Sequence, residues 1–437
     1  MNQGRCKVLK PQYVVEEGSL TIEIYGGYRE IGGNCIVIRD GDRRIVFDNG
    51  IRFSVLRKYY RGKIQPLGPR ELRNIGAIPP IEIFEDIDAL YISHFHLDHL
   101  GLLGALPPGT RVYVPSTSIL KIIEEWYRAV PTWLAELPPK LNIDVREFVS
   151  HEEDELGVIP ILVSHSAYPS YALIYRGSDK TVFYSGDLRV SGPLRSQVDT
   201  LLSIEKVANV TSIDIALIEG TNIGGIETPI GPEEFKDMFN KILMESELVV
   251  VSVDPLDFEM LTALSELAML NGRTIVVASA RIVDIIPYWL ESFKLADSAE
   301  PAISTELEKP PPIPVQHISI RQDVMKNPGE YLLIQEPVGF LEMLRQMRLW
   351  GEKPPAGTTA VLTTPEPFEA EAEVEEEVLA SWLLSLGIQV YRLRLSGHYY
   401  PYELKKILRI VKARKIVPIH TRHPRLMLAL ADKLKHN

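Results

Sequence analysis

Cysteine is scarce in this sequence, which contains only Cys6 and Cys35 among 437 residues. So small a number excludes a disulfide-stapled secreted domain and favours a reducing compartment in which both thiols are free. A single bridge between the two cysteines is the alternative. The first ten residues are polar and contain no signal-peptide core, so we expect a cytoplasmic protein.

Long hydrophobic runs and an excess of positive charge are also lacking. No apolar stretch approaches the roughly 20 residues of a membrane span, so we expect no membrane partner. The formal net charge of −11 argues against a nucleic-acid partner. That argument is weak, because two bound divalent cations would add about four positive charges where a polyanion would bind. The charge balance therefore neither supports nor excludes a polyanionic substrate.

One dense group of metal-ligand residues is present, His94-Phe95-His96-Leu97-Asp98-His99. It follows residues 87–93, whose apolar and β-branched composition predicts a strand, and precedes residues 100–106, which predict the start of a helix. The carboxyl end of a strand is where α/β proteins usually place their chemistry. Neutral imidazole together with carboxylate suits zinc and other borderline divalent metals.

Six consecutive residues cannot surround one ion, because alternate side chains point in different directions. His94 and His96 can face one ion, whereas Asp98 and His99 can face a second. The remaining ligands must therefore come from distant parts of the chain.

Several other predicted strands also end at a residue that can bind a metal. Strand 160–164 leads to His165, strand 181–184 to Asp187, and strand 416–419 to His420. His165 can be the third ligand of the first ion and His420 can complete the second site. Asp187 can bridge both ions through its two oxygens. Two ions about 3.5–4 Å apart could hold a bridging hydroxide as nucleophile and polarise a phosphoryl oxygen.

The chain length predicts two or three domains. The pattern of the first half predicts mostly strands, whereas the pattern from about residue 233 onward predicts an alternation of strands and helices. Residues 248–253 predict a strand, 257–270 a helix and 274–278 a parallel strand. This alternation predicts an α/β fold with a second, small open α/β domain.

These residues match a known family in order along the chain. The sequence resembles the metallo-β-lactamase superfamily, whose five motifs correspond to Asp48, the six-residue motif, His165, Asp187 and His420. It also resembles the β-CASP nucleic-acid-processing branch, through motifs that contain Glu219, His398 and the segment 417–421. Residues 26–34 resemble the opening of ribonuclease J and its archaeal relatives, and the mRNA 3′-end processing factors are similar members of the branch.

The resemblance implies an αββα sandwich interrupted by an inserted α/β domain. Residues 1–227 would form the first part of the sandwich, residues 228–386 the β-CASP insert, and residues 387–437 the completion of the sandwich. The insert would close over the metal face and form a groove for a single strand. Because the sequence ends at Asn437, we expect no further C-terminal domain of the bacterial ribonuclease J type.

The resemblance also implies roles for individual residues. Asp98 would be both a metal ligand and the proton acceptor for the attacking water, and Asp48 would orient a ligand histidine from outside the coordination sphere. Glu219 would orient His398, the general acid toward the leaving oxygen. The candidates for phosphate or substrate binding are Ser396, Thr221 and Tyr399. The alternatives are a satisfied turn hydroxyl for the first two and core packing for the tyrosine.

The function implied is a metal-dependent ribonuclease that hydrolyses phosphodiester bonds in RNA processing or decay. Its cofactors would be two divalent ions, Zn²⁺ or else Mn²⁺, and its partner single-stranded RNA, with DNA as the alternative. Exonuclease or endonuclease mode and a homodimer are left open. A hydrolase of a small ester or thioester would share the metal motif but would need neither Glu219, His398 nor the insert. A non-catalytic scaffold subunit is disfavoured, because every ligand position is filled.

Overall fold

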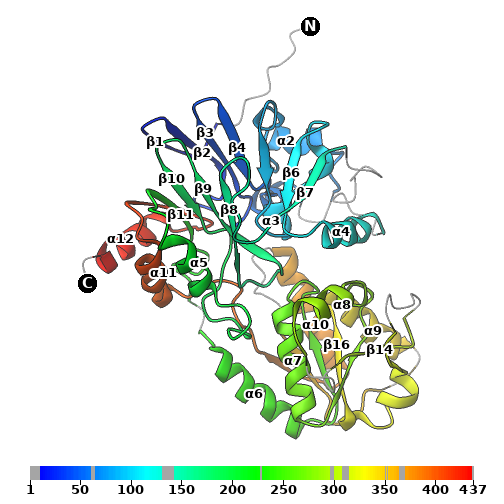
Figure 1. Cartoon of the computed structure of the whole chain (residues 1–437). Helices are drawn as coiled ribbons and strands as arrows, with labels where there is room; N and C mark the ends of the chain where they lie inside the picture. Colours follow the sequence, from blue (N-terminus) through cyan, green and yellow to red (C-terminus); the bar gives the residue numbers. More distant parts are fainter. Residues whose placement is uncertain are drawn as a thin grey trace. The chain divides into compact units, whose positions relative to one another are not determined.

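The computed structural model describes residues 10–60, 64–129, 142–226, 229–295, 300–307, 314–349, 351, 353–363 and 370–435. The chain divides into two compact units (Figure 1). The first unit consists of Met1–Val190, Val198–Glu227 and His398–Asn437, and the second of Ser191–Gln197 and Thr228–Gly397. Each unit has its own sheets and its own core.

The first unit contains two sheets. The first sheet has seven strands in chain order, antiparallel from β1 to β4 and parallel from β4 to β7: β1 (Tyr13–Glu17), β2 (Leu20–Gly26), β3 (Cys35–Asp40), β4 (Arg43–Phe47), β5 (Ala89–Tyr91), β6 (Arg111–Val114) and β7 (Asp144–Glu147). The second sheet has the order β19-β11-β10-β9-β8: β8 (Val158–Val163), β9 (Ser170–Arg176), β10 (Thr181–Tyr184), β11 (Ile215–Glu219) and β19 (Lys415–Ile419). Strands β10, β11 and β19 are parallel to one another.

The two sheets pack face to face through alternate residues of their strands. Ile36 and Ile38 of β3 lie in one core with Leu173 and Tyr175 of β9. The residues between them, such as Val37, are also buried, because helices cover the outer faces. These helices are α1 (Phe53–Tyr59), α2 (Pro69–Ile75), α3 (Leu97–Leu100), α4 (Thr117–Ala129), α5 (Thr200–Ala208), α11 (Leu404–Val411) and α12 (Pro424–Lys435). This is the predicted αββα sandwich.

The second unit is built on a seven-stranded sheet in which all neighbouring strands are parallel. Its order is β15-β14-β13-β16-β12-β17-β18, with β12 (Val249–Ser252), β13 (Thr274–Val277), β14 (Ala302–Ser304), β15 (His317–Ile318), β16 (Tyr331–Gln335), β17 (Thr359–Leu362) and β18 (Gln389–Arg392). Its helices are α6 (Pro232–Glu245), α7 (Phe258–Leu270), α8 (Ala280–Ser292), α9 (Pro337–Leu349) and α10 (Ala370–Ser385). This unit is the predicted α/β insert.

Short helices of other types connect these elements. They are η1 (Ile81–Ile83), η2 (Leu103–Ala105), η5 (Ile320–Val324), η6 (Pro328–Glu330) and η7 (Pro401–Glu403). Among the described residues, no helix combines the length and apolar character needed to cross a membrane.

The structure differs from the sequence-based expectation at two places. Residues 387–397 were assigned to the sandwich, but β18 pairs with β17 in parallel and Val390 packs on the core of the second unit. The α-helix expected to start within residues 100–106 does not form, because α3 ends at Leu100 and only the short 3-10 helix η2 follows. Gly101 follows with φ of 60°, and its backbone lies so close to Asn49 that no side chain would fit there.

Candidate metal centre and proton-donor pair

The strand ends of the first unit bring the predicted ligands together. The motif follows β5, His165 follows β8, Asp187 follows β10 and His420 follows β19. Two of the residues at strand ends have positive φ values, 60° for Asp48 and 47° for His420. Such values are uncommon outside glycine, and backbone strain of this kind concentrates at functional sites.

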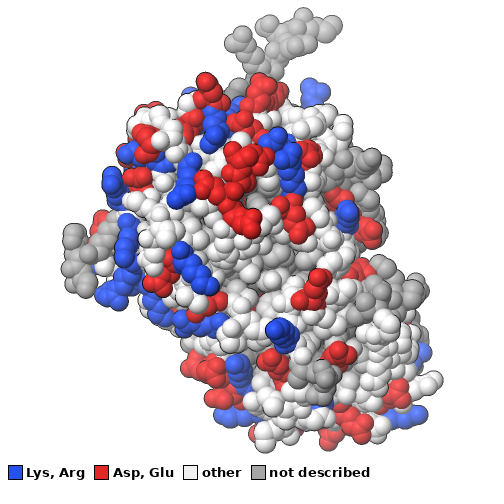
Figure 2. All heavy atoms as spheres, in the orientation of Figure 1, with Lys and Arg blue, Asp and Glu red and all other residues white. Residues whose placement is uncertain are grey.

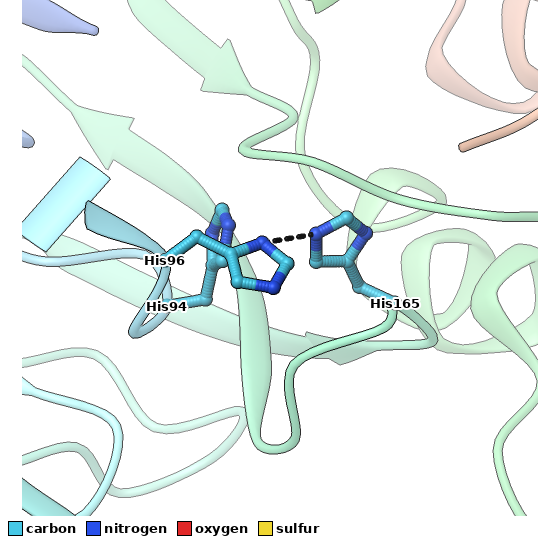
Figure 3. A group of neighbouring side chains, drawn as sticks. All are labelled: His94, His96 and His165. Carbon is cyan, nitrogen blue, oxygen red and sulfur yellow. Dashed lines mark hydrogen bonds between the residues drawn. The ribbon is translucent and has the colours of Figure 1, made fainter. Parts of the chain in front are cut away.

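Three histidines form the first group. The rings of His94, His96 and His165 point toward one another (Figure 3), with ring centres 4.7 to 4.9 Å apart. His96 Nδ1 and His165 Nε2 are 3.1 Å apart. One nitrogen from each ring lies within 4.8 Å of the others. This spacing suits a single ion bound by three imidazoles.

Asp98, His99, Asp187 and His420 form the second group, and their ligand atoms also lie within 4.8 Å of one another. His420 Nε2 is 3.1 Å from Asp98 Oδ2. His99 Nε2 is 3.1 Å from Asp187 Oδ2. Two carboxylates and two imidazoles therefore converge on one point.

Asp187 lies between the two groups. Its Oδ2 atom is 3.1 Å from His99 Nε2 and 3.5 Å from His420 Nε2 in the second group. The same oxygen is 3.8 Å from His94 Nε2 and 3.9 Å from His165 Nε2 in the first. Of the carboxylates described here, it is the one placed to serve both groups.

Hydrogen bonds fix which ring nitrogens are free to bind a metal. The Asp48 carboxylate can only accept, so the 2.7 Å contact with His99 Nδ1 requires a proton on that nitrogen. Ser93 Oγ donates to Asp48 at 2.9 Å, so it must accept from His94 Nδ1 at 3.0 Å. When these two rings are neutral, Nε2 therefore carries the lone pair. Tyr184 also donates to Asp48, at 2.5 Å.

Several buried polar atoms at this place have no hydrogen-bond partner, as expected of metal ligands. They are His94 Nε2, His99 Nε2 and Asp187 Oδ1. Burial, with His99 beside it, holds the pKa of His94 well below its usual range, so this ring is neutral. Burial raises the pKa of Asp98, but His99 and His420 outweigh it and lower that pKa to about 2. His94 thus offers a neutral imidazole and Asp98 an ionised carboxylate, two kinds of donor that fit divalent metal ions.

Glu219, Thr221 and His398 form a hydrogen-bonded group beside the second set of ligands. His398 Nδ1 is 3.1 Å from Glu219 Oε1, and Thr221 Oγ1 donates to Glu219 Oε2 at 2.8 Å. Because its single proton is used there, Thr221 Oγ1 must accept from His420 Nδ1, 2.9 Å away. One hydroxyl therefore connects the Glu219–His398 pair to His420 and leaves His420 Nε2 free.

His398 and Asp98 are among the more exposed members of the site. Their side chains are 12% and 20% exposed, compared with 0% for His94 and His99. Burial lowers the pKa of His398, but the charge and hydrogen bond of Glu219, together with the charges of Asp187 and Asp98, outweigh it and raise the pKa. A substrate can therefore meet a histidine that tends to carry a proton.

Residues 26–34, which are rich in glycine, pack against this site. Gly32 has φ of 78°, and a side-chain carbon there would lie 2.7 Å from Asp98 Oδ2. Gly27 accepts a hydrogen bond from the backbone N–H of His420 at 2.5 Å. Glycine is required at position 32 because the backbone there approaches Asp98 directly.

The three substrate-binding candidates have different outcomes. Tyr399 is only 1% exposed and packs in the core beneath α11, and its hydroxyl donates to the Glu219 carbonyl at 2.5 Å. The expected role of Tyr399 in substrate binding is wrong, because the ring is enclosed. Thr221 is buried with its hydroxyl engaged in the protein, as the alternative interpretation held. Ser396 is half-buried at the end of the second unit, and its role stays a prediction.

Some contributors to the site were not identified from the sequence. Ser93, Tyr184 and Asn34 form a chain of hydroxyl and amide groups behind Asp48, in which Asn34 donates to Tyr184 at 2.9 Å. A serine or a tyrosine in a strand gives no pattern that distinguishes this use from ordinary packing. The position of Ser93, directly between strand and motif, was the available signal.

Comparisons with known proteins agree with this geometry. Residues 28–201 match the family model described as Metallo-beta-lactamase superfamily. The chain is 24% identical over 428 residues to Ribonuclease J of Pyrococcus abyssi, covering 91% of this chain and 89% of that protein. It is 23% identical over 446 residues to Ribonuclease J of Mycoplasma pneumoniae, covering 95% and 70%. A crystal structure of a protein of unknown function from Enterococcus faecalis has the same fold, with a TM-score of 0.71, 21% identity and coverage of 94% of this chain and 96% of that one.

The sandwich and the family model matched over residues 28–201 support the metallo-β-lactamase superfamily that the sequence resembles. The inserted α/β unit and the two relatives that span nearly the whole chain narrow this assignment. These findings support the β-CASP branch of the metallo-β-lactamase superfamily, which the sequence resembles.

Proposed function

We propose that this protein is a metal-dependent ribonuclease that hydrolyses phosphodiester bonds in RNA processing or decay. The observation that carries the proposal is the position of the Glu219–His398 pair beside the histidine and aspartate cluster. Relatives named Ribonuclease J, similar over nine-tenths of this chain, support RNA as the substrate. Nothing in their names favours a small ester or thioester.

The metal ligands proposed are the seven residues of the two groups, with Asp187 shared: His94, His96, His165, Asp98, His99, Asp187 and His420. The Nε2 atoms of His94, His99 and His420 are freed for this role by the hydrogen bonds of their Nδ1 atoms. We propose Zn²⁺ as the native ion and Mn²⁺ as the alternative, because three imidazoles favour zinc. When bound, divalent ions lower the pKa of a water molecule and polarise a phosphoryl oxygen.

The protein residues supply the proton transfers. The ionised carboxylate of Asp98 accepts the proton of the attacking water. His398, held at Nδ1 by Glu219, presents Nε2 to the leaving oxygen and donates a proton to it. Asp48 keeps the His99 ring in the orientation that binding requires.

A reconstitution experiment tests this function. Protein stripped of metal is reloaded with Zn²⁺ or Mn²⁺ and assayed on 5′-labelled single-stranded RNA and on DNA of the same sequence, as wild type, Asp98→Asn and His398→Ala. We expect about two ions per chain, cleavage of RNA by the wild type, and a loss of about 10²–10⁴-fold on removal of the acid. Product lengths separate exonuclease from endonuclease action.

Equal activity of the three proteins, or failure of every preparation to bind about two ions, would contradict the mechanism. Cleavage of DNA in preference to RNA would instead assign the protein to the DNA-directed nucleases of the branch. The cytoplasmic location stays a prediction from the sequence.

A further inference from the structure

The last forty residues of this acidic protein are strongly basic. Residues 398–437 contain ten Lys or Arg and two Asp or Glu, whereas the whole chain has a net charge of −11. Figure 2 shows Lys and Arg side chains gathered along the side of the first unit where α11 and α12 lie. Positive charge is thus concentrated on one part of a unit that is otherwise acidic.

Two basic residues of α11 and the lysine that follows the helix form a short row of positive charge. Leu404, Ile407 and Val411 are buried in the core against the second sheet. Lys405 and Arg409 are four residues apart and share a face of α11. Lys412 directly follows the helix, with φ of 49°, and both Arg409 and Lys412 are exposed. We call these three residues the basic stripe. No described carboxylate makes an ion pair with any of them, in contrast to Lys406, which lies 3.8 Å from Glu403.

Arg422 and Arg425 continue the positive surface at the start of α12. Both are exposed and neither is in a described ion pair. A helix N-terminus disfavours cations, and the first turn of α12 contains no acid to offset them. Like charges at intervals of four in α11 are also unfavourable. Helix stability therefore accounts for neither set of cations.

The stripe and the arginines are connected to the candidate site through the chain. His398 lies six residues before α11, and His420 lies four residues before α12. Arg422 is two residues beyond His420, so their Cα atoms are at most about 7 Å apart. The two helices also pack against each other and on the same core. Positive charge therefore begins next to the metal ligands and extends along α11.

We propose that the basic stripe, with Arg422 and Arg425, binds phosphates of the RNA strand whose cleavage occurs at the neighbouring site. The proposal rests on the ribonuclease function and adds to it a binding surface outside the site. A lipid surface is a poorer partner, because the apolar side of α11 is already buried and cannot enter a membrane. Phosphate groups at regular intervals match cations at regular intervals.

The test compares two charge-reversal variants of the full-length chain. One variant carries Lys405→Glu, Arg409→Glu and Lys412→Glu. The control carries Lys121→Glu, Lys241→Glu and Lys326→Glu, which reverses three exposed cations elsewhere and changes the net charge equally. Binding of single-stranded RNA of about 20 nucleotides and about five nucleotides is measured over a range of salt, in the His398→Ala background to keep the RNA intact.

We expect the stripe variant to bind the long RNA at least about tenfold more weakly than the control does. The negative slope of the logarithm of the binding constant against the logarithm of the salt concentration should become less steep by about 2, because three phosphate contacts are lost. In the catalytically intact background, the ratio of kcat/KM for long over short RNA should fall by a similar factor. The Lys405→Gln, Arg409→Gln, Lys412→Gln variant should give an intermediate loss, which also covers the case in which charge reversal prevents folding.

Equal binding of long RNA by the stripe and control variants overturns the proposal, whatever the cleavage result. Polyglutamate serves as a probe for an acidic protein partner. If the stripe variant loses binding to polyglutamate but keeps its binding to RNA, the proposal is also overturned, in favour of such a partner. Failure of the wild type to cleave any RNA is a different result, because it contradicts the ribonuclease function itself.

Discussion

Parallel strands occur in both units, and in both units polar residues stand where neighbouring strands end. In the first unit these residues are histidines and carboxylates, with buried atoms such as Asp187 Oδ1 that have no hydrogen-bond partner. In the second unit Gln335, at the end of β16, donates to the Ala278 carbonyl, and Thr363, directly after β17, donates to the Ser252 carbonyl. Within the described residues, clusters of three or more potential metal ligands occur only in the first unit.

The comparison shows that topology alone does not make a site. The carboxyl ends of parallel strands bring side chains together in any open sheet. In the second unit those side chains bind the backbone and hold neighbouring strands. In the first unit, Asp48, Ser93 and Thr221 instead accept hydrogen bonds from Nδ1 of His99, His94 and His420 and leave Nε2 of these rings free.

Replacement of Asp187 should have the largest effect on the metal centre that distinguishes the first unit from the second. Asp187→Asn removes the charge that faces both groups of ligands, so we expect loss of bound metal and a fall in cleavage rate of at least about a thousandfold. Metal content by elemental analysis and the rate on labelled RNA check this. The matched control is Glu336→Gln directly after β16 in the second unit, which should retain the full metal content. Retention of two ions by Asp187→Asn would show that it is not a ligand.

Much of this contrast was predictable from the sequence, because it depends on residues of distinctive chemistry at strand ends. His165, Asp187 and His420 were found in that way, and the strand-helix alternation predicted the second unit. The hydrogen bonds that select a ring nitrogen were not predictable. They depend on the angle at which Ser93 or Thr221 meets an imidazole, and neither residue type signals that use. Tyr399 was misassigned because the sequence does not distinguish an aromatic residue that faces solvent after a site histidine from one that faces the core.

Replacement of Thr221 tests whether the orientation of the rings matters as much as the ligands. Thr221→Val removes the hydroxyl that donates to Glu219 and accepts from His420, while the side-chain volume is conserved. We expect a loss of about 10–100-fold in metal affinity or activity. Thr221→Ser, which keeps the hydroxyl, should recover most of it. Metal titration and kcat are the measurements, and equal values for the valine and serine variants would refute the role.

Replacement of Trp289 tests whether the second unit can be weakened without change to the metal centre. Trp289 is fully buried in α8 and donates to Thr262 Oγ1 at 2.8 Å. Trp289→Phe should lower the free energy of unfolding by about 2 kcal/mol through the cavity and the lost hydrogen bond. Metal content should stay unchanged. The control Phe183→Leu, in the core beneath Asp187, should lower both stability and metal retention. Loss of metal from Trp289→Phe would show that the units are energetically coupled.

The smallest expected effect concerns a carboxylate of the second unit that stabilises its fold without any metal. Partial burial raises the pKa of Glu306, but hydrogen bonds from the backbone of Ile320 and Arg321 and the hydroxyls of Ser304 and Ser319 outweigh it and lower the pKa from 4.5 to about 2. A lowered pKa means that the stabilisation is present above pH 4.5 and is lost as the pH falls toward 2.

Because the side chain of Glu306 is exposed, solvent screening limits the contribution to about 1 kcal/mol. Glu306→Gln should therefore be less stable than wild type at pH 7 in urea unfolding, and the difference should shrink between pH 4.5 and 2. A difference that stays constant over this range would mean that ionisation of Glu306 does not contribute to stability.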